Sequence, residues 1–159
     1  MIVKNIEEFL QFLEIGRPIL SIDYGSYKTG IAISDVNHKI AFPKSFISSN
    51  SSKEKILQIQ KLILRLNPCA LVIGIAFNFQ NEFTNSTKSI LAFSKQLAKI
   101  TELPIFFQDE RSTSRLVHKL DFFYKLSNKN SPPGREDMLA ARAILESVLE
   151  SIKQLKNDS

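Results

Sequence analysis

Apolar residues along this chain follow two patterns, short continuous runs and helical repeats. Continuous runs bounded by turn residues are typical of buried strands, which predicts strands at residues 19–24, 31–35, 40–47, 70–75 and 104–109. Apolar positions that recur at i, i+3, i+4 and i+7 indicate the buried face of a helix, which predicts helices at residues 5–15, 51–66, 84–100 and 137–155. The chain therefore combines both kinds of element.

The order of these elements predicts the architecture. The first three strands follow one another through short turns, as in an antiparallel meander. Strands and helices then alternate, as they do when right-handed crossovers join parallel strands. The run over 70–75 is apolar throughout, which is typical of a parallel sheet covered on both faces. We therefore expect an α/β fold: a mixed sheet of an antiparallel three-strand meander plus two parallel strands, with helices on both faces.

Two of the predicted helices carry start signals. Asn5 is followed three residues later by Glu8, the spacing of a capping box, and the amphipathic helix that follows is expected to pack on the body of the protein. Ser51-Ser52 can cap the next helix, which should end before Pro68.

Composition bounds the class of protein. The 159 residues include 43% hydrophobic and 23% charged side chains, so residues 1–159 are expected to form one domain, with 1–17 as an N-terminal helical extension. A single cysteine, Cys69, excludes an internal disulfide and favours a reducing compartment; with only His38 and His118 beside it, a structural zinc site is excluded too. Both histidines are expected on the exposed surface, and no apolar run is long enough to span a membrane.

The positive charge is concentrated in one segment. The chain carries a net charge of +5, and the stretch 111–135 holds six basic residues against one acid, so it accounts for the whole excess. The aromatic residues at 122–124 interrupt this stretch, and basic and aromatic side chains together suit a nucleic acid. The alternative is a solvated helix face whose aromatic side chains belong to the core.

Three acidic residues fall where sheet proteins carry chemistry. Asp23 ends the first strand, Glu110 follows the last strand, and Asp137 opens the last helix. The positions 4, 7 and 11 residues after Asp137 are apolar, which places its side chain on the face toward the sheet. Because strand ends in α/β sheets point to a shared crevice, the three carboxylates are expected to converge.

Such a cluster needs compensation. Two carboxylates about 4 Å apart repel by roughly 4 kcal/mol at an effective dielectric constant of 20, so they require a shared proton or a cation. Without zinc-type ligands, the expected cofactor is a hard divalent ion held by oxygen atoms, Mg²⁺ or Mn²⁺. Two such ions can activate water and stabilise the leaving oxygen of a phosphodiester.

Each acid also has a purely structural interpretation. Asp23 can shape the turn at Gly25, Glu110 can lie in the first turn of a capped helix, and Asp137 can complement a helix dipole. Their shared position at one end of the predicted sheet favours a joint role. Asp35 ends the second strand without comparable support and is interpreted as a turn residue.

Four segments, in this order, resemble the YqgF/RuvX family. They are DYGSYKTGIAISD at 23–35, LVIG at 71–74, DERST at 109–113 and DMLAARAIL at 137–145. The resemblance covers nearly everything from residue 19 to 149. It implies an RNase H-like fold and a bacterial, cytoplasmic nuclease that matures the 5′ end of the 16S rRNA precursor, in a family also described as Holliday junction resolvases.

The resemblance also implies roles for individual residues. The family's acidic triad, expected to be both catalytic and metal-binding, falls on Asp23, Glu110 and Asp137. Polar positions beside the triad, where phosphate contacts are expected, fall on Lys28, Thr29 and Arg111. Within the basic segment, further contacts to the nucleic-acid backbone are expected from Arg115 and Lys119.

The sequence departs from the family pattern in one loop. Gly74 corresponds to the glycine after the family's fourth strand, but Ile75-Ala76 replaces a hydrophobic residue and proline, and Gln80-Asn81 replaces Asp-Gly. The triad is untouched, so the atypical loop over 75–83 affects substrate selection rather than chemistry.

Three other functions use related features. A resolvase of four-way DNA junctions would use the same triad in a dimer. A noncatalytic nucleic-acid-binding domain would not need the triad, and ATPases of related fold use two copies where 159 residues hold one. The expected partner is structured RNA, the 16S rRNA precursor, or else branched DNA, with no membrane and with the chain as a monomer or weak homodimer.

Overall fold

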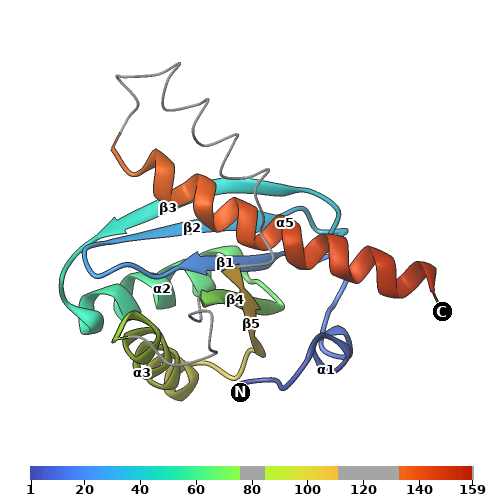
Figure 1. Ribbon diagram of the computed structural model, residues 1–159, viewed down its shortest axis with the longest axis horizontal. Helices are drawn as coiled ribbons and strands as arrows, with labels where there is room; N and C mark the ends of the chain where they lie inside the picture. The colour runs from blue at the N-terminus through green and yellow to red at the C-terminus, as the bar shows by residue number, and fades with distance from the viewer. Residues whose placement is uncertain (76–84, 111–132, 159) are drawn as a thin grey trace.

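A single five-stranded mixed sheet forms the centre of the molecule (Figure 1). The computed structural model describes residues 1–75, 85–110 and 133–158. The strands are β1 (Ile19–Asp23), β2 (Lys28–Ser34), β3 (Ala41–Ser48), β4 (Ala70–Ile75) and β5 (Ile105–Asp109), in the order β3-β2-β1-β4-β5. The first three pair antiparallel, and β1, β4 and β5 pair in parallel. The predicted fold class is confirmed.

Helices cover both faces of the sheet. The elements are α1 (Ile6–Leu10), α2 (Ser52–Leu66), α3 (Asn85–Ile100) and α5 (Arg135–Asn157). In Figure 1, α5 crosses one face and α2 and α3 lie on the other, and α1 packs near α5. No helix in the described ranges is both long and apolar enough to cross a membrane.

Strand alternation divides the core into two layers. Leu20 and Ile22 of β1 face α2 and α3, whereas Ser21 between them faces α5. The Ser21 hydroxyl donates a hydrogen bond of 2.9 Å to the backbone carbonyl of Ala141, so a buried polar group is satisfied where helix and sheet meet. β4 is buried at all six positions, as its continuous apolar run predicts.

The N-terminal helix is shorter than predicted. The Asn5 side chain caps it by accepting from the Glu8 N–H at 2.8 Å, but the helix ends at Leu10 and tight turns follow. Ahead of the helix, Ile2 pairs with Ile105 of β5 through backbone hydrogen bonds. After Leu10 the backbone N–H groups of Phe12 and Leu13 bond to carbonyl groups three residues back, so the helix gives way to turns that lead to β1. Ser51 caps α2 as predicted, accepting from the Glu54 N–H.

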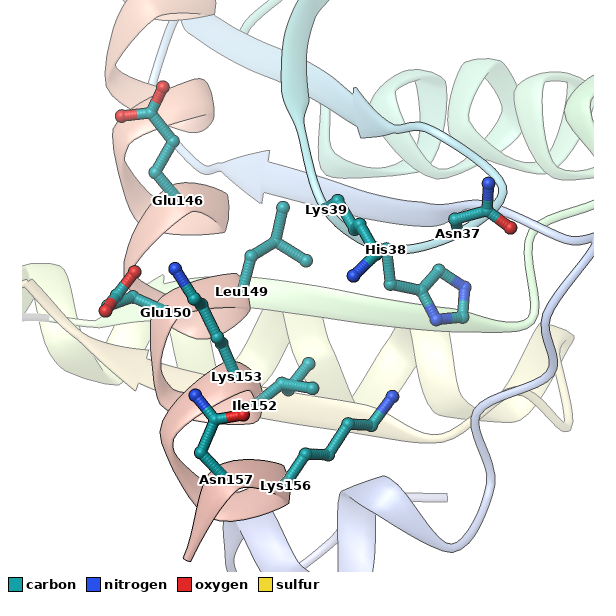
Figure 2. Close-up of a pocket in the computed structure, with 10 residues that line it drawn as sticks. All are labelled: Asn37, His38, Lys39, Glu146, Leu149, Glu150, Ile152, Lys153, Lys156 and Asn157. Atoms are coloured by element: carbon teal, nitrogen blue, oxygen red, sulfur yellow. The ribbon is translucent and has the colours of Figure 1, made fainter.

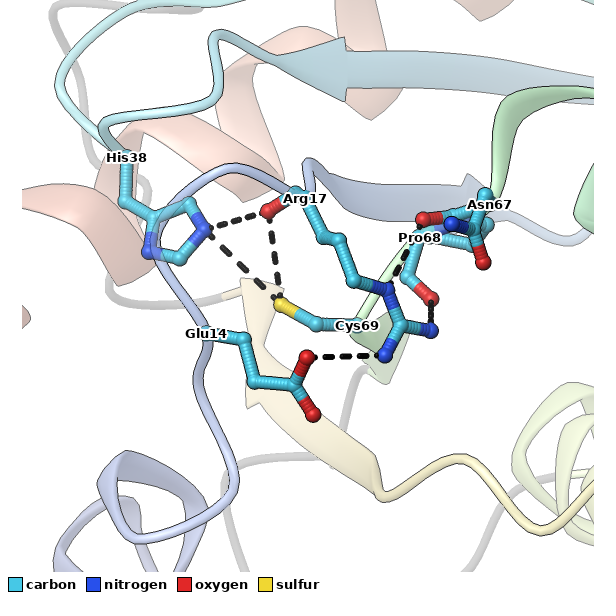
Figure 3. A network of polar contacts seen from close by, with 6 residues as sticks. All are labelled: Glu14, Arg17, His38, Asn67, Pro68 and Cys69. Atoms are coloured by element: carbon cyan, nitrogen blue, oxygen red, sulfur yellow. Dashed lines mark hydrogen bonds and ion pairs between the residues drawn. The ribbon is translucent and has the colours of Figure 1, made fainter.

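The expectation that His38 is exposed is wrong. The turn between β2 and β3 is folded by Asp35, whose carboxylate accepts hydrogen bonds from three following backbone N–H groups. His38 takes a left-handed conformation there (φ 59°) and is only 4% exposed. Its Nε2 lies 2.7 Å from the Arg17 carbonyl oxygen (Figure 3), and a carbonyl can only accept, so Nε2 carries the proton. Asp35 is the predicted turn residue, and His118 lies outside the described residues.

Arg17 joins three parts of the chain in the same network. Its guanidinium donates to the carbonyl oxygens of Asn67 and Pro68 and pairs with Glu14 at 2.9 Å (Figure 3). The network connects the segment before β1, the β2–β3 turn and the end of α2. It fixes the edge of the molecule at which β1 begins.

α5 approaches β2 so closely that only glycine fits at position 30. A Cβ atom at Gly30 would collide with the backbone carbonyl of Asp137. Gly30 pairs with Asp23 in the β1–β2 ladder, so this contact sets the distance between the start of α5 and the end of β1.

We expect Gly30→Ala to lower the melting temperature by at least about 5 °C, because the methyl group must push α5 away from the sheet; this corresponds to roughly 2 kcal/mol for a chain of this length. Thermal unfolding followed by circular dichroism measures the shift. Lys44→Ala, on the exposed side of β3, is the control and should leave the melting temperature unchanged. An unshifted Gly30→Ala variant would contradict the close approach.

Candidate active site

Three elements bring acidic residues to one edge of the sheet. Asp23 is the last residue of β1, Glu110 directly follows β5, and Asp137 lies in the first turn of α5. β1 and β5 run in the same direction on either side of β4, so their carboxyl ends share an edge. α5 starts at this edge because Gly30, opposite Asp23, meets the backbone of Asp137.

A second glycine makes room for Glu110. A Cβ atom at Gly74 would collide with the Ile144 side chain and lie 2.8 Å from Oε1 of Glu110. Gly74 therefore leaves the space on the α5 face of β4 that the Glu110 carboxylate uses. The sequence comparison with the family placed this glycine after the fourth strand, but it is the fifth residue of β4. Its role is close packing within the strand rather than a turn.

Burial and the proximity of these acids raise the pKa of Asp23. Burial is the largest cause that raises the pKa of Asp23. The negative charge of Glu110, a hydrogen bond to the Glu110 side chain and the charge of Asp137 raise this pKa further, to about 8. Two carboxyl groups can form that hydrogen bond only when one of them holds a proton. The structure thus places Glu110 and Asp137 near enough to Asp23 for their charges to raise its pKa.

The donor set fits a hard divalent cation. Across residues 1–75, 85–110 and 133–158, no three His, Cys, Asp or Glu side chains lie close enough together to hold a metal ion, and this includes the trio Asp23, Glu110 and Asp137. Mg²⁺ rarely needs a closed cage of such side chains, since one or two carboxylates, water and substrate phosphate usually complete its shell. A cation beside Asp23 and Glu110 would offset the repulsion between their charges. The all-oxygen chemistry of these acids suits Mg²⁺ or Mn²⁺.

The expected phosphate contacts are only partly described. Lys28 begins β2 beside the acids and is half-buried. Thr29 is fully buried, with its hydroxyl 3.4 Å from the Gly25 carbonyl oxygen, because strand alternation turns it toward the interior. Thr29 therefore supports the loop and has no surface to offer to phosphate. The expected contacts at Arg111, Arg115 and Lys119, the basic stretch around them and the atypical loop over 76–83 lie outside the described residues.

One residue beside the acids was missed by the sequence analysis. Lys55 of α2 is fully buried, and its ammonium donates hydrogen bonds of 2.8 Å to the carbonyl oxygens of both Gly25 and Ser26. Lys55 precedes Ile59 and Leu62, both buried, by four and seven residues. That helical spacing was the signal: a lysine on the apolar face of a helix needs a partner inside.

Comparison with known proteins agrees with this arrangement. A family model described as "RuvX: Holliday junction resolvase" matches residues 17–151. This chain belongs to the RuvX family. The resemblance drawn from the sequence motifs is thereby confirmed.

Two relatives and a solved structure are similar to this RuvX chain over most of its length. Proteins named "Putative pre-16S rRNA nuclease" from Rickettsia peacockii (strain Rustic) and Rickettsia africae (strain ESF-5) are each 36% identical over 157 residues, covering 98% of this chain and 100% of their own length. That alignment includes most of the N-terminal extension. A Thermus thermophilus RuvC structure in complex with a Holliday junction substrate matches with a TM-score of 0.55 at 12% identity, over 86% of this chain and 96% of its own.

A viral structure shares the same architecture. The Fowlpox virus resolvase in complex with Holliday junction DNA matches with a TM-score of 0.53 at 16% identity, over 85% of this chain and 98% of its own. At such low identity these two structures establish the fold of the RuvX chain, which is RNase H-like as the motifs predict.

The pocket shown in Figure 2 lies away from the acids. It has a volume of about 510 Å³ and is lined by the β2–β3 turn and the C-terminal half of α5. Lysine and glutamate side chains both line it, among them Lys39, Lys153, Glu146 and Glu150. Because α5 starts at the acids and ends at this pocket, the pocket is separate from the candidate site.

The raised pKa of Asp23 predicts that the stability of the fold depends on pH. Unfolded Asp23 loses its proton near pH 3.8, whereas folded Asp23 keeps it up to about pH 8, so the folded state loses stability as the pH rises between these values. We expect Asp23→Asn, in the presence of chelator, to melt about 5 °C higher than the wild type at pH 8 and with a much smaller difference near pH 4.5.

Asp35→Asn is the matched control, because the hydrogen bonds that Asp35 accepts lower its pKa. This variant should show no gain in stability at either pH. An Asp23→Asn gain that is the same at both pH values would show that burial and the neighbouring acids do not act on the Asp23 proton.

Proposed function

We propose that this RuvX protein is a divalent-metal-dependent nuclease that hydrolyses phosphodiester bonds in structured RNA, with the 16S rRNA precursor as its substrate. The observation that carries the proposal is the raised pKa of Asp23, which is buried and lies near the charges of Glu110 and Asp137. The names of the Rickettsia relatives, which align over 98% of the chain, support the choice of substrate. The same relatives and the RuvX family support hydrolysis as the reaction.

The three acids would bind the divalent cation at the reacting phosphate. Asp23, Glu110 and Asp137 would hold Mg²⁺ or Mn²⁺, and when bound the cation supplies Lewis acidity and neutralises charge at phosphorus. Asp23, whose pKa is raised to about 8 by burial and by the neighbouring acids, would lose its proton on binding the cation. Lys28, next to the acids at the start of β2, would orient the scissile phosphate through its positive charge.

Hydrolysis of four-way DNA junctions is the second candidate. The description of the matching family model favours it, and a dimer would then cut two strands symmetrically. A nucleic-acid-binding domain without catalysis is the remaining alternative, and the three converging carboxylates argue against it because binding alone does not need them. Both alternatives predict different outcomes in the assay below.

Several properties belong to the same proposal. We infer that residues 1–159 act as one nuclease domain, that the protein works in the cytoplasm, where the rRNA precursor is made, and that it is a monomer or weak homodimer. The basic segment at 111–135 would bind the backbone on either side of the cut.

Purified protein should cleave precursor 16S rRNA in Mg²⁺ or Mn²⁺ and not in chelator, with the ends mapped by primer extension. Asp23→Asn should lower the rate at least about 1,000-fold while the protein stays folded, because the substitution removes the charge at nearly constant volume.

Glu136→Gln is the control, since Glu136 precedes Asp137 in α5 but is exposed; this variant should keep its activity. Preferential cutting of junction DNA in competition would favour the resolvase. Binding of RNA without any cleavage by the wild type would favour the noncatalytic domain, and an active Asp23→Asn variant would remove Asp23 from the mechanism.

The basic segment predicts a salt dependence. Each phosphate contact contributes about 0.7 to 0.9 to the slope of log K against log salt concentration. Replacing both Arg115 and Lys119 by alanine should weaken RNA binding and reduce the slope by about 1.6, as measured by fluorescence anisotropy at several salt concentrations. Lys44→Ala on β3 should leave the slope unchanged. An unaltered slope in the double variant would show that this segment does not touch the nucleic acid.

A further inference from the structure

The loop between β1 and β2, residues 24–27, is held from the inside by a buried cation. The Lys55 ammonium donates to the Gly25 and Ser26 carbonyl oxygens, both at 2.8 Å, and lies 4.5 Å from the centre of the Tyr24 ring. An ammonium group has three N–H donors, and two carbonyl groups and an aromatic face can satisfy all three. The loop that follows Asp23 is therefore fixed to α2 by a residue with no exposed surface.

A second contact fixes the far end of the loop. The Tyr27 carbonyl accepts a hydrogen bond of 2.8 Å from the Ser49 N–H, and the Ser49 hydroxyl donates at 2.8 Å to Glu54 of α2. The backbone of the loop is thus anchored on both sides of Ser26. Such a loop has little conformational freedom left to lose when a ligand binds.

The two tyrosines of this loop have opposite environments. Tyr24 packs on Phe93 of α3, with ring centres 4.5 Å apart. Tyr27 is 52% exposed although its backbone is anchored. It stands between Asp23, four residues before it, and Lys28, the next residue, so the chain length limits its Cα atom to about 14 Å from that of Asp23. Tyr27 is therefore an exposed ring on an anchored backbone, within reach of the chain segment that carries Asp23 and Lys28.

We propose that Tyr27 is a stacking platform for an unpaired base of the bound RNA strand next to the scissile phosphate, and that Lys55 is the positioning residue that holds this platform in place. The inference rests on the proposed function for the identity of the strand. Every base has a face that can stack on an aromatic ring, and bases that are not already stacked in a duplex bind such rings best. The preferred substrate therefore has a single-stranded flank at the cut.

The test uses an RNA hairpin with an unpaired flank in which 2-aminopurine replaces one base at a time, because its fluorescence falls when it stacks. All variants are made in the Asp23→Asn protein, with chelator present, so that the RNA stays intact. We expect quenching at one flank position, its loss in Tyr27→Leu with about 10-fold weaker binding, and its retention in Tyr27→Phe. Phe42→Leu is the matched control, since Phe42 is 48% exposed at the other end of the β2–β3 hairpin.

Lys55 is tested by the same signal. Lys55→Met keeps the length of the side chain but leaves two carbonyl groups without a donor, so quenching should fall although Tyr27 is present. Lys55→Arg, which retains donors and charge, should restore part of it. Ile59→Val, a conservative substitution at a buried position one turn further along α2, controls for lost stability. If Lys55→Met does not fold, the surface variants of Tyr27 still decide the proposal.

The outcomes separate this inference from the proposed nuclease. Unchanged quenching and affinity in Tyr27→Leu, or no flank position that is quenched at all, would overturn the stacking platform whether or not the wild type cleaves. Normal quenching in Lys55→Met would overturn the role of Lys55. Cleavage of the same hairpin by the wild type in Mg²⁺ is measured separately, and its absence together with Tyr27-dependent quenching would reject the nuclease and retain the platform.

Discussion

The close contact between α5 and the sheet is the constraint on which the candidate site depends. A helix with ordinary side-chain packing stands about 10 Å from a strand, but Gly30 lets the backbone of α5 touch β2 directly at Asp137. The glycine pairs with Asp23, so one contact positions two of the three acids. Gly74 then admits the third by leaving space for the Glu110 carboxylate.

Placing these acids near one another lowers the stability of the fold, and the hydrophobic packing around them offsets this loss. Asp23 is buried beside two other carboxylates, which favours its protonated form. Two hydrophobic layers and a fully buried β4 hold the sheet rigid around it. A cation near Asp23 would relieve this repulsion, and the backbone packing at Gly30 and Gly74 already limits where the acids can lie.

Much of this could be predicted from the sequence, and the exceptions have physical reasons. The apolar runs over 70–75 and 104–109 gave strands, and the apolar positions after Asp137 correctly oriented α5 toward the sheet. The burial of His38 was missed because it depends on a left-handed turn built by Asp35, which no periodicity reveals. Lys55 was missed because lysine is usually exposed. Its partners are backbone carbonyl groups, which leave no trace in the sequence.

The pairing of Ile2 with Ile105 also governs how this sheet meets other molecules. Residues 1–3 pair with Ile105, the first residue of the edge strand β5, and the opposite edge strand, β3, carries Pro43 and Lys44 and a bulge in its pairing with β2. An unprotected strand edge is a template for pairing with another chain. The first three residues therefore occupy the start of an edge that would otherwise be free to pair with another chain.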